Sequence, residues 1–112
     1  MTTVKLCELD ALEPDSVTAI DVDGRAILAA RVGDAWYALD DTCSHAKVSL
    51  ADGILEEDDL VIECPAHGAL FSLETGEPLT LPATRPVARH DVAVRDDGVY
   101  VTIVQEGHEE QE

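Results

Sequence analysis

The chain has 112 residues, of which 24 are acidic and seven are Lys or Arg, so its formal net charge is −17. This length fits one domain with a core of its own, and so acidic a surface excludes nucleic acid and anionic membranes as natural partners. The sequence has neither a signal peptide nor an apolar run near the roughly 20 residues that span a bilayer, so we expect a cytoplasmic protein. The acidity either guides the chain to a basic protein partner or keeps it in solution, and charge alone leaves both open.

The first third of the chain predicts an antiparallel meander. Four short apolar or alternating stretches favour strands, at residues 4–9, 17–22, 25–32 and 35–39. Asp23-Gly24 separates the second stretch from the third, and such a pair is the strongest short signal for a hairpin turn. Gly33-Asp34 predicts a second hairpin in the same way. We therefore expect these four strands to follow one another in the sheet.

The pattern changes after residue 40 and returns to alternation near residue 91. Between these points residues 60–62 form the one strong β run, and residues 46–59, with their acidic segment 56–59, predict an exposed loop. Further strands are expected at 91–95 and 99–104. No convincing helical period is present. The sequence thus predicts an all-β protein, with an antiparallel barrel or sandwich base over residues 1–104 and an inserted loop-rich subdomain at about 41–82. Residues 105–112 predict an acidic mobile tail.

Two mixed Cys–His pairs lie in the inserted part. Cys43-Ser44-His45 and Cys64-Pro65-Ala66-His67 are separated by 18 residues, and each pair is short enough for one loop. Two thiolates and two imidazoles are the ligands of a [2Fe–2S] cluster in which histidines replace two cysteines on one iron. The predicted ligands are therefore Cys43, His45, Cys64 and His67, with the [2Fe–2S] cluster as cofactor.

Two other kinds of site use these residue types. A structural zinc site accepts two Cys and two His, but usually with two to four residues inside each pair, which the single spacer in Cys43-Ser44-His45 does not match. A catalytic Cys–His pair needs one of each residue and would leave the second pair unexplained. Both patterns fit less well than the iron–sulfur site.

The chain resembles the Rieske ferredoxin family in segments on both sides of these pairs. The matching segments occur in the family's order: Cys43-Ser44-His45-Ala46, Asp52-Gly53, residues 64–71, Thr75-Gly76-Glu77-Pro78, residues 81–86 and Val99-Tyr100-Val101. The resemblance implies a β base that carries a cluster-binding subdomain. It also implies that Cys43 and Cys64 bind the inner iron and that His45 and His67 bind the outer iron.

The same resemblance implies the function. The chain is too short for an oxygenase's own iron domain, and it lacks the membrane anchor and extra cysteines of respiratory members. We expect a monomeric one-electron carrier, not itself an enzyme, between an NADH-dependent flavoprotein ferredoxin reductase and the terminal oxygenase of an aromatic-ring dioxygenase. A carrier for iron–sulfur assembly or nitrite reduction would have the same sequence features.

Departures from the high-potential members predict a low reduction potential. Those members carry bridging cysteines and, after the second histidine, a Ser and a Tyr whose hydroxyls donate hydrogen bonds toward the cluster; this chain has Ala69 and Phe71. Fewer donors stabilise the reduced cluster less. Cys7 is expected to be a small core residue. His90 and His108 have no ligand spacing, so the sequence assigns them no function.

Overall fold

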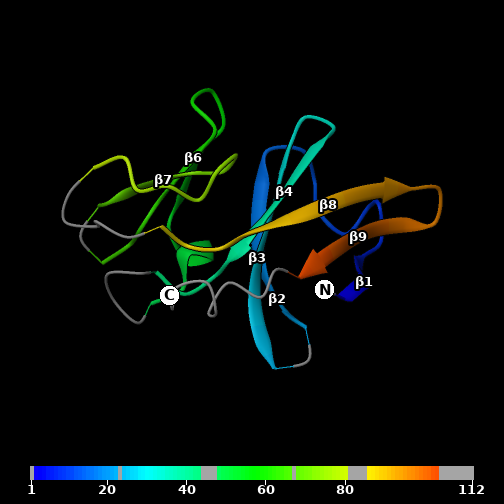
Figure 1. Ribbon diagram of the computed structural model, residues 1–112. Helices are drawn as coiled ribbons and strands as arrows, with labels where there is room; N and C mark the ends of the chain where they lie inside the picture. Colours follow the sequence, from blue (N-terminus) through cyan, green and yellow to red (C-terminus); the bar gives the residue numbers. More distant parts are fainter. Residues whose placement is uncertain (1, 23, 44–47, 67, 81–85, 104–112) are drawn as a thin grey trace.

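The computed structural model describes residues 2–22, 24–43, 48–66, 68–80 and 86–103. In this part of the chain the strands form a six-stranded antiparallel sheet, in the order β1-β9-β8-β4-β3-β2, and a three-stranded antiparallel sheet, β5-β6-β7 (Figure 1). The elements are β1 Thr2–Cys7, β2 Ser16–Val22, β3 Arg25–Val32, β4 Ala35–Asp40, the 3₁₀ turn η1 Leu50–Asp52, β5 Ile54–Glu56, β6 Val61–Glu63, β7 Leu70–Ser72, β8 Arg89–Arg95 and β9 Gly98–Ile103. The predicted all-β antiparallel architecture is confirmed.

Both predicted hairpins of the first third are present. β2 and β3 pair up to Val22↔Arg25, and β3 and β4 pair up to Val32↔Ala35, so each connection has two residues. Gly33 has φ +59°, a conformation that glycine adopts without steric cost. The meander therefore holds for β2, β3 and β4.

The prediction that the first strand belongs to this meander is wrong. β1 pairs with β9 at the other end of the chain, beginning at Thr2↔Ile103, and does not pair with β2. The loop between β1 and β2 carries the chain across the core, because Leu12 is buried and its carbonyl accepts a hydrogen bond from Arg31 Nη1 at 2.8 Å. A loop anchored in this way does not return the chain beside β1.

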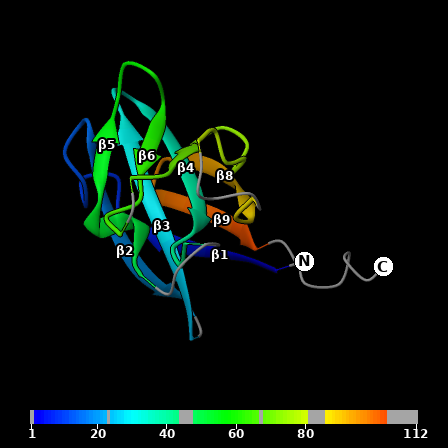
Figure 2. The same ribbon diagram turned by 90° about the vertical axis from the view of Figure 1, so that its left-hand side faces the viewer.

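Residues 41–88, here called the insert, lie between β4 and β8 and contain η1 and the three-stranded sheet. The sequence predicted a loop at 46–59 and one strand at 60–62. The structure corrects this, because Leu50 is fully buried in η1, and β5 pairs with β6 from Ile54↔Glu63. The strands β5 and β7 were missed because three residues are too few to show alternation. Figure 2 shows β5 and β6 from the side of the insert.

The core is divided by β3, which is buried on both faces. Leu28 and Ala30 pack in a cluster with the insert, whereas Ile27 and Ala29 pack in a second cluster with β1 and β9. Successive residues of a strand face opposite sides, so the apolar run at 26–30 serves both clusters. Figure 1 shows the same division, with the insert on one side of β2, β3 and β4 and with β9 and β1 on the other.

Two further expectations concern the chain as a whole. Among the described residues, no helix is long and apolar enough to cross a membrane. Cys7, expected in the core, is half-buried and packs against the cluster of β1 and β9, and burial raises the pKa of its thiol. The predicted division into one domain and a tail stays a prediction, since residues 105–112 lie outside the described part.

Candidate metal centre

The first cysteine lies at the start of a loop with a well-bonded stem. The Cys43 amide donates to the carbonyl of Val48 at 3.0 Å, which closes the loop 43–48. Below it, the Leu50 amide donates to the carbonyl of Asp41 at 2.7 Å. The Asp41 carboxylate accepts hydrogen bonds from the Ser49 hydroxyl and, at 2.9 Å, from the Ala51 amide. Asp41 is itself 4% exposed, so a buried carboxylate ties both sides of the stem together.

The second cysteine begins a similar loop at the end of β6. The Cys64 amide donates to the carbonyl of Ala69 at 2.7 Å, and the Gly68 amide donates to the carbonyl of Cys64 at 3.0 Å. Gly68 has φ +78°, so its glycine is explained by backbone conformation. The family resemblance suggested that the missing Cβ allows close approach to the cluster, and this stays a prediction.

Both cysteines are buried in the same core cluster, although they come from different loops. Cys43 is 4% exposed and Cys64 is 1% exposed, and they share this cluster with Leu50, Ile62 and Phe71. Two buried sulfur ligands that converge from two closed loops fit a metal cluster held by thiolates. The residues present therefore fit the predicted cofactor on its cysteine side.

The histidine side lies outside the described residues. His45 falls within 44–47 and His67 is likewise not described, so the predicted fourfold ligand set stays a prediction. Within the described residues, no group of three or more His, Cys, Asp or Glu side chains could hold a metal ion. The segment 81–85, expected to cover the cluster, is also outside them.

Comparison with known proteins decides the family. A model of the Rieske [2Fe–2S] domain matches residues 2–95. The chain belongs to the Rieske [2Fe–2S] domain family. It is 35% identical over 106 residues to the 3-phenylpropionate/cinnamic acid dioxygenase ferredoxin subunit of Photorhabdus laumondii, covering 95% of this chain and 99% of that protein.

Solved structures of Rieske ferredoxins have the same fold. The ferredoxin of carbazole 1,9a-dioxygenase from Nocardioides aromaticivorans superposes with a TM-score of 0.88 and 39% identity, over 93% of this chain and 100% of that one. The ferredoxin in a complex of reduced oxygenase and oxidised ferredoxin of carbazole 1,9a-dioxygenase gives a TM-score of 0.82 and 38% identity, over 89% and 92%. The chain is therefore an electron carrier with a Rieske [2Fe–2S] cofactor and is not itself a catalyst.

The residues that distinguish this Rieske chain from high-potential members lie in the core. Ala69 and Phe71 are both fully buried in the cluster that contains Cys43 and Cys64. Neither side chain has a hydroxyl, so neither donates a hydrogen bond to a sulfur atom. The placement agrees with the predicted low potential, which stays a prediction.

Sequence reasoning missed a charged cluster at the end of β4. Arg25 donates to Asp40 through Nε at 2.9 Å and through Nη2 at 3.0 Å, and His90 Nε2 lies 2.9 Å from Asp40 Oδ1. Burial alone would raise the pKa of Asp40, but the hydrogen bonds from His90 and Arg25 hold that pKa below its usual value. His90 is 1% exposed, although the sequence gave it no role.

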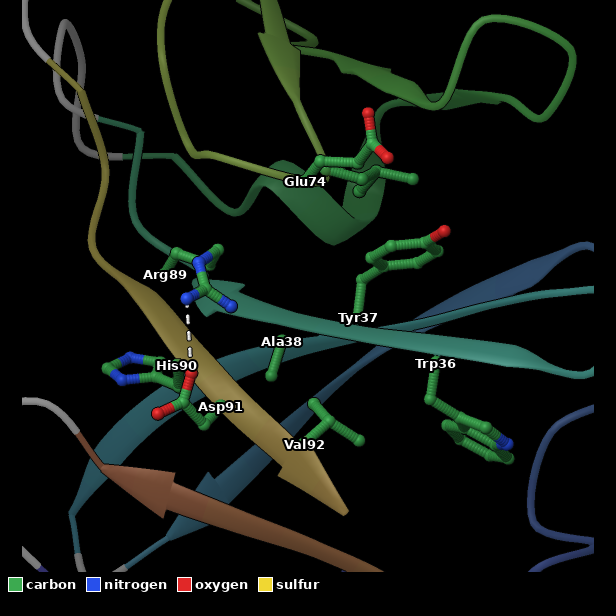
Figure 3. A pocket seen from close by; sticks show the side chains of 9 residues that line it. Trp36, Tyr37, Ala38, Glu74, Arg89, His90, Asp91 and Val92 are labelled. Atoms are coloured by element: carbon green, nitrogen blue, oxygen red, sulfur yellow. Dashed lines mark hydrogen bonds and ion pairs between the residues drawn. The ribbon is translucent and has the colours of Figure 1, made fainter. Parts of the chain in front are cut away.

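An open groove of about 470 Å³ lies where β4 and β8 diverge, beside the turn that follows β7. Figure 3 shows Tyr37 and Trp36 extending in different directions from β4, and the ion pair between Arg89 and Asp91 along β8, which measures 3.1 Å. The residues that line this groove include neither Cys43 nor Cys64. It is therefore separate from the metal centre.

Proposed function

We propose that this chain carries single electrons from a flavoprotein, NADH-dependent ferredoxin reductase to the terminal oxygenase of a ring-hydroxylating dioxygenase. Cys43, His45, Cys64 and His67 hold the [2Fe–2S] cluster, which takes up and releases one electron at a time when bound. The observation that carries the proposal is the burial of Cys43 and Cys64 in one core cluster, each at the start of a closed loop. The ferredoxin of carbazole 1,9a-dioxygenase, 38% identical, is known in complex with its oxygenase and supports the choice of partner.

The protein's own residues keep water away from the thiolate side of the cluster and hold the thiolates in place. Leu50, Ile62 and Phe71 are fully buried around the two cysteines. By the family resemblance, His45 and His67 bind the outer iron and present their second ring nitrogen to a partner. The electron would then enter and leave on the histidine side. A cytoplasmic location fits this role, because the free thiol of Cys7 is typical of a reducing compartment.

The ligand assignment is tested by substitution. Cys43→Ser, His45→Ala, Cys64→Ser and His67→Ala should each abolish the visible absorbance and the EPR signal of the reduced protein. Cys7→Ser is the matched control and should keep both, because Cys7 lies in the other core cluster. A Cys64→Ser variant that keeps a native EPR signal would contradict the assignment.

The outer face of the three-stranded sheet offers a surface on which the oxygenase could dock. Ile54 pairs with Glu63, and Glu63 pairs with Leu70, so their side chains share one face. The Leu79 amide donates to the carbonyl of Leu70 at 2.7 Å, which continues this row. Ile54 and Leu79 are 57% and 53% exposed. The row ends next to Cys64, which follows Glu63 in the chain.

Charge indicates what kind of oxygenase surface would fit there. The exposed turn at 56–59 of the β5–β6 hairpin is entirely acidic, and Glu63 lies within the row. An oxygenase surface with an apolar centre and basic residues at its rim would complement both features. We therefore assign the row Ile54, Glu63, Leu70 and Leu79 to contact with the oxygenase.

Reconstitution tests both the pathway and the surface. The reduced protein should transfer electrons to a purified ring-hydroxylating oxygenase, and the reductase should reduce it in turn. Ile54→Ser and Leu79→Ser should each lower the second-order rate of transfer to the oxygenase about tenfold. Val94→Ser is the matched control, because Val94 is 54% exposed on β8, away from the insert. Rapid reduction of a nitrite reductase, with no transfer to any oxygenase, would overturn the proposed pathway.

A further inference from the structure

Arg25, Asp40 and His90 form a charged clasp across three strands. Arg25 is the first residue of β3, Asp40 is the last residue of β4 and His90 is the second residue of β8. The two Arg25 contacts and the His90 contact with Asp40 measure 2.9 to 3.0 Å. The His90 side chain is 0% exposed and that of Asp40 is 22% exposed. A charge-assisted cluster this well enclosed has a definite geometry.

The clasp lies where the chain leaves the base and where it returns. Asp40 is the last base residue before the insert, and its amide donates to the carbonyl of Ala88 at 2.8 Å, at the end of the insert. Among the described residues the ladder between β4 and β8 is short, with the pairs Ala38↔His90 and Leu39↔Arg89. Both connections between base and insert therefore meet at the clasp.

The stem of the first ligand loop continues directly from this point. The Asp41 amide donates to the carbonyl of Ala26, the neighbour of Arg25, at 3.1 Å. The Asp41 carboxylate then holds Ser49 and Ala51, and Cys43 follows two residues later. A change in the direction of the chain at Asp40 is thus transmitted through a bonded stem to Cys43.

We propose that Arg25, Asp40 and His90 are positioning residues for the cluster, because they fix the direction in which the insert presents the Cys43 loop. This inference rests on the proposed ligand role of Cys43. Loss of the clasp should leave the fold in place but loosen the stem, so that the cluster is released faster and its electronic environment becomes heterogeneous.

The experiment uses the cluster-loaded protein and compares Asp40→Asn with Asp34→Asn. Asp34 forms an exposed pair with Arg31 at 3.4 Å, so its variant removes an equivalent charge away from the stem. We expect Asp40→Asn to increase hydrogen exchange in the peptide 41–52 and the rate of iron release to a chelator, each by about tenfold or more. We also expect broadened EPR g-values and a shifted midpoint potential. Asp34→Asn should match the wild type in all four measurements.

A purely structural role would give a different result. In that case Asp40→Asn would lower the melting temperature, and exchange would rise equally in the peptides from β2 and β9, with unchanged EPR g-values and potential. That outcome overturns the proposal. If Asp40→Asn does not fold, Arg25→Lys keeps the charge but loses the two-point contact, and should give smaller changes of the same kind; wild-type behaviour of Arg25→Lys and His90→Gln together would also overturn it. A wild-type protein without the EPR signal would instead refute the proposed ligands.

Discussion

Gly53 lies so close to the backbone of β6 that replacing it with Ala should disturb the second ligand loop. A Cβ at this position would lie 1.8 Å from the carbonyl oxygen of Glu63, about 1.6 Å short of ordinary van der Waals contact, and 3.2 Å from the carbonyl oxygen of Leu50. Gly53 has φ −88°, so Ala fits its backbone conformation and the whole cost comes from the contact. Both neighbours are backbone atoms, which cannot move aside as a side chain can.

The cost of this contact is worked out from the required displacement. Overpacking typically costs about 1–3 kcal/mol, and a backbone-to-backbone clash of this size belongs at the upper end, at about 3 kcal/mol. For a domain of this size that corresponds to a fall in Tm of about 12 °C. The displaced Glu63 carbonyl is bonded to the Cys64 amide, which donates to Ala69 at 2.7 Å. The variant should therefore also release iron faster.

Gly33→Ala is the matched control for Gly53→Ala. Gly33 has φ +59° but nothing lies within 4 Å of its Cβ position. The left-handed backbone alone should cost about 1 kcal/mol, or about 4 °C in Tm. Circular dichroism melts and the decay of visible absorbance under chelator measure both effects. The reasoning is refuted if Gly53→Ala melts within about 3 °C of Gly33→Ala and keeps its absorbance as long.

Three further outcomes are expected. Phe71→Tyr places a donor in the cluster of the two cysteines, and one hydrogen bond worth about 1 kcal/mol more to the reduced state should raise the midpoint potential by about 40 mV in a redox titration. Because the pKa of Asp40 is lowered in the folded protein, its contribution to stability is complete above the usual value of 3.8 and is lost as pH falls through the lower folded value; wild type should therefore lose stability below about pH 4 in denaturant titrations, and Asp40→Asn should lack this part of the loss. With a net charge of −17, the rate of electron transfer to the oxygenase should fall steeply between low and physiological ionic strength in stopped-flow measurements, and a salt-independent rate would exclude electrostatic guidance.

Local signals in the sequence predicted those parts of the fold that are decided locally. The two-residue turns at Asp23-Gly24 and Gly33-Asp34 gave the register of β2, β3 and β4 directly. The pairing of β1 with β9 joins opposite ends of the chain, and alternation within each strand does not specify its partner. The contact between Asp40 and His90 likewise spans 50 residues, so it appears only once the strands are in place. The spacing of Cys43 and Cys64 predicted ligands, but their meeting in one buried cluster depends on the packing of the insert.

The insert explains why the cofactor site and the base depend on each other. Its strands have three residues each, too few for a sheet that is stable by itself. The inward-facing residues Leu55, Ile62 and Phe71 pack in the same cluster as Leu28 and Leu39 of the base. The two cysteines belong to this shared cluster and not to a separate core of the insert. Ligands that converge only when insert and base are packed together make cofactor binding and this packing thermodynamically linked. Contacts at the joint, such as Gly53 with Glu63 and Asp40 with His90, therefore influence the metal centre without touching it.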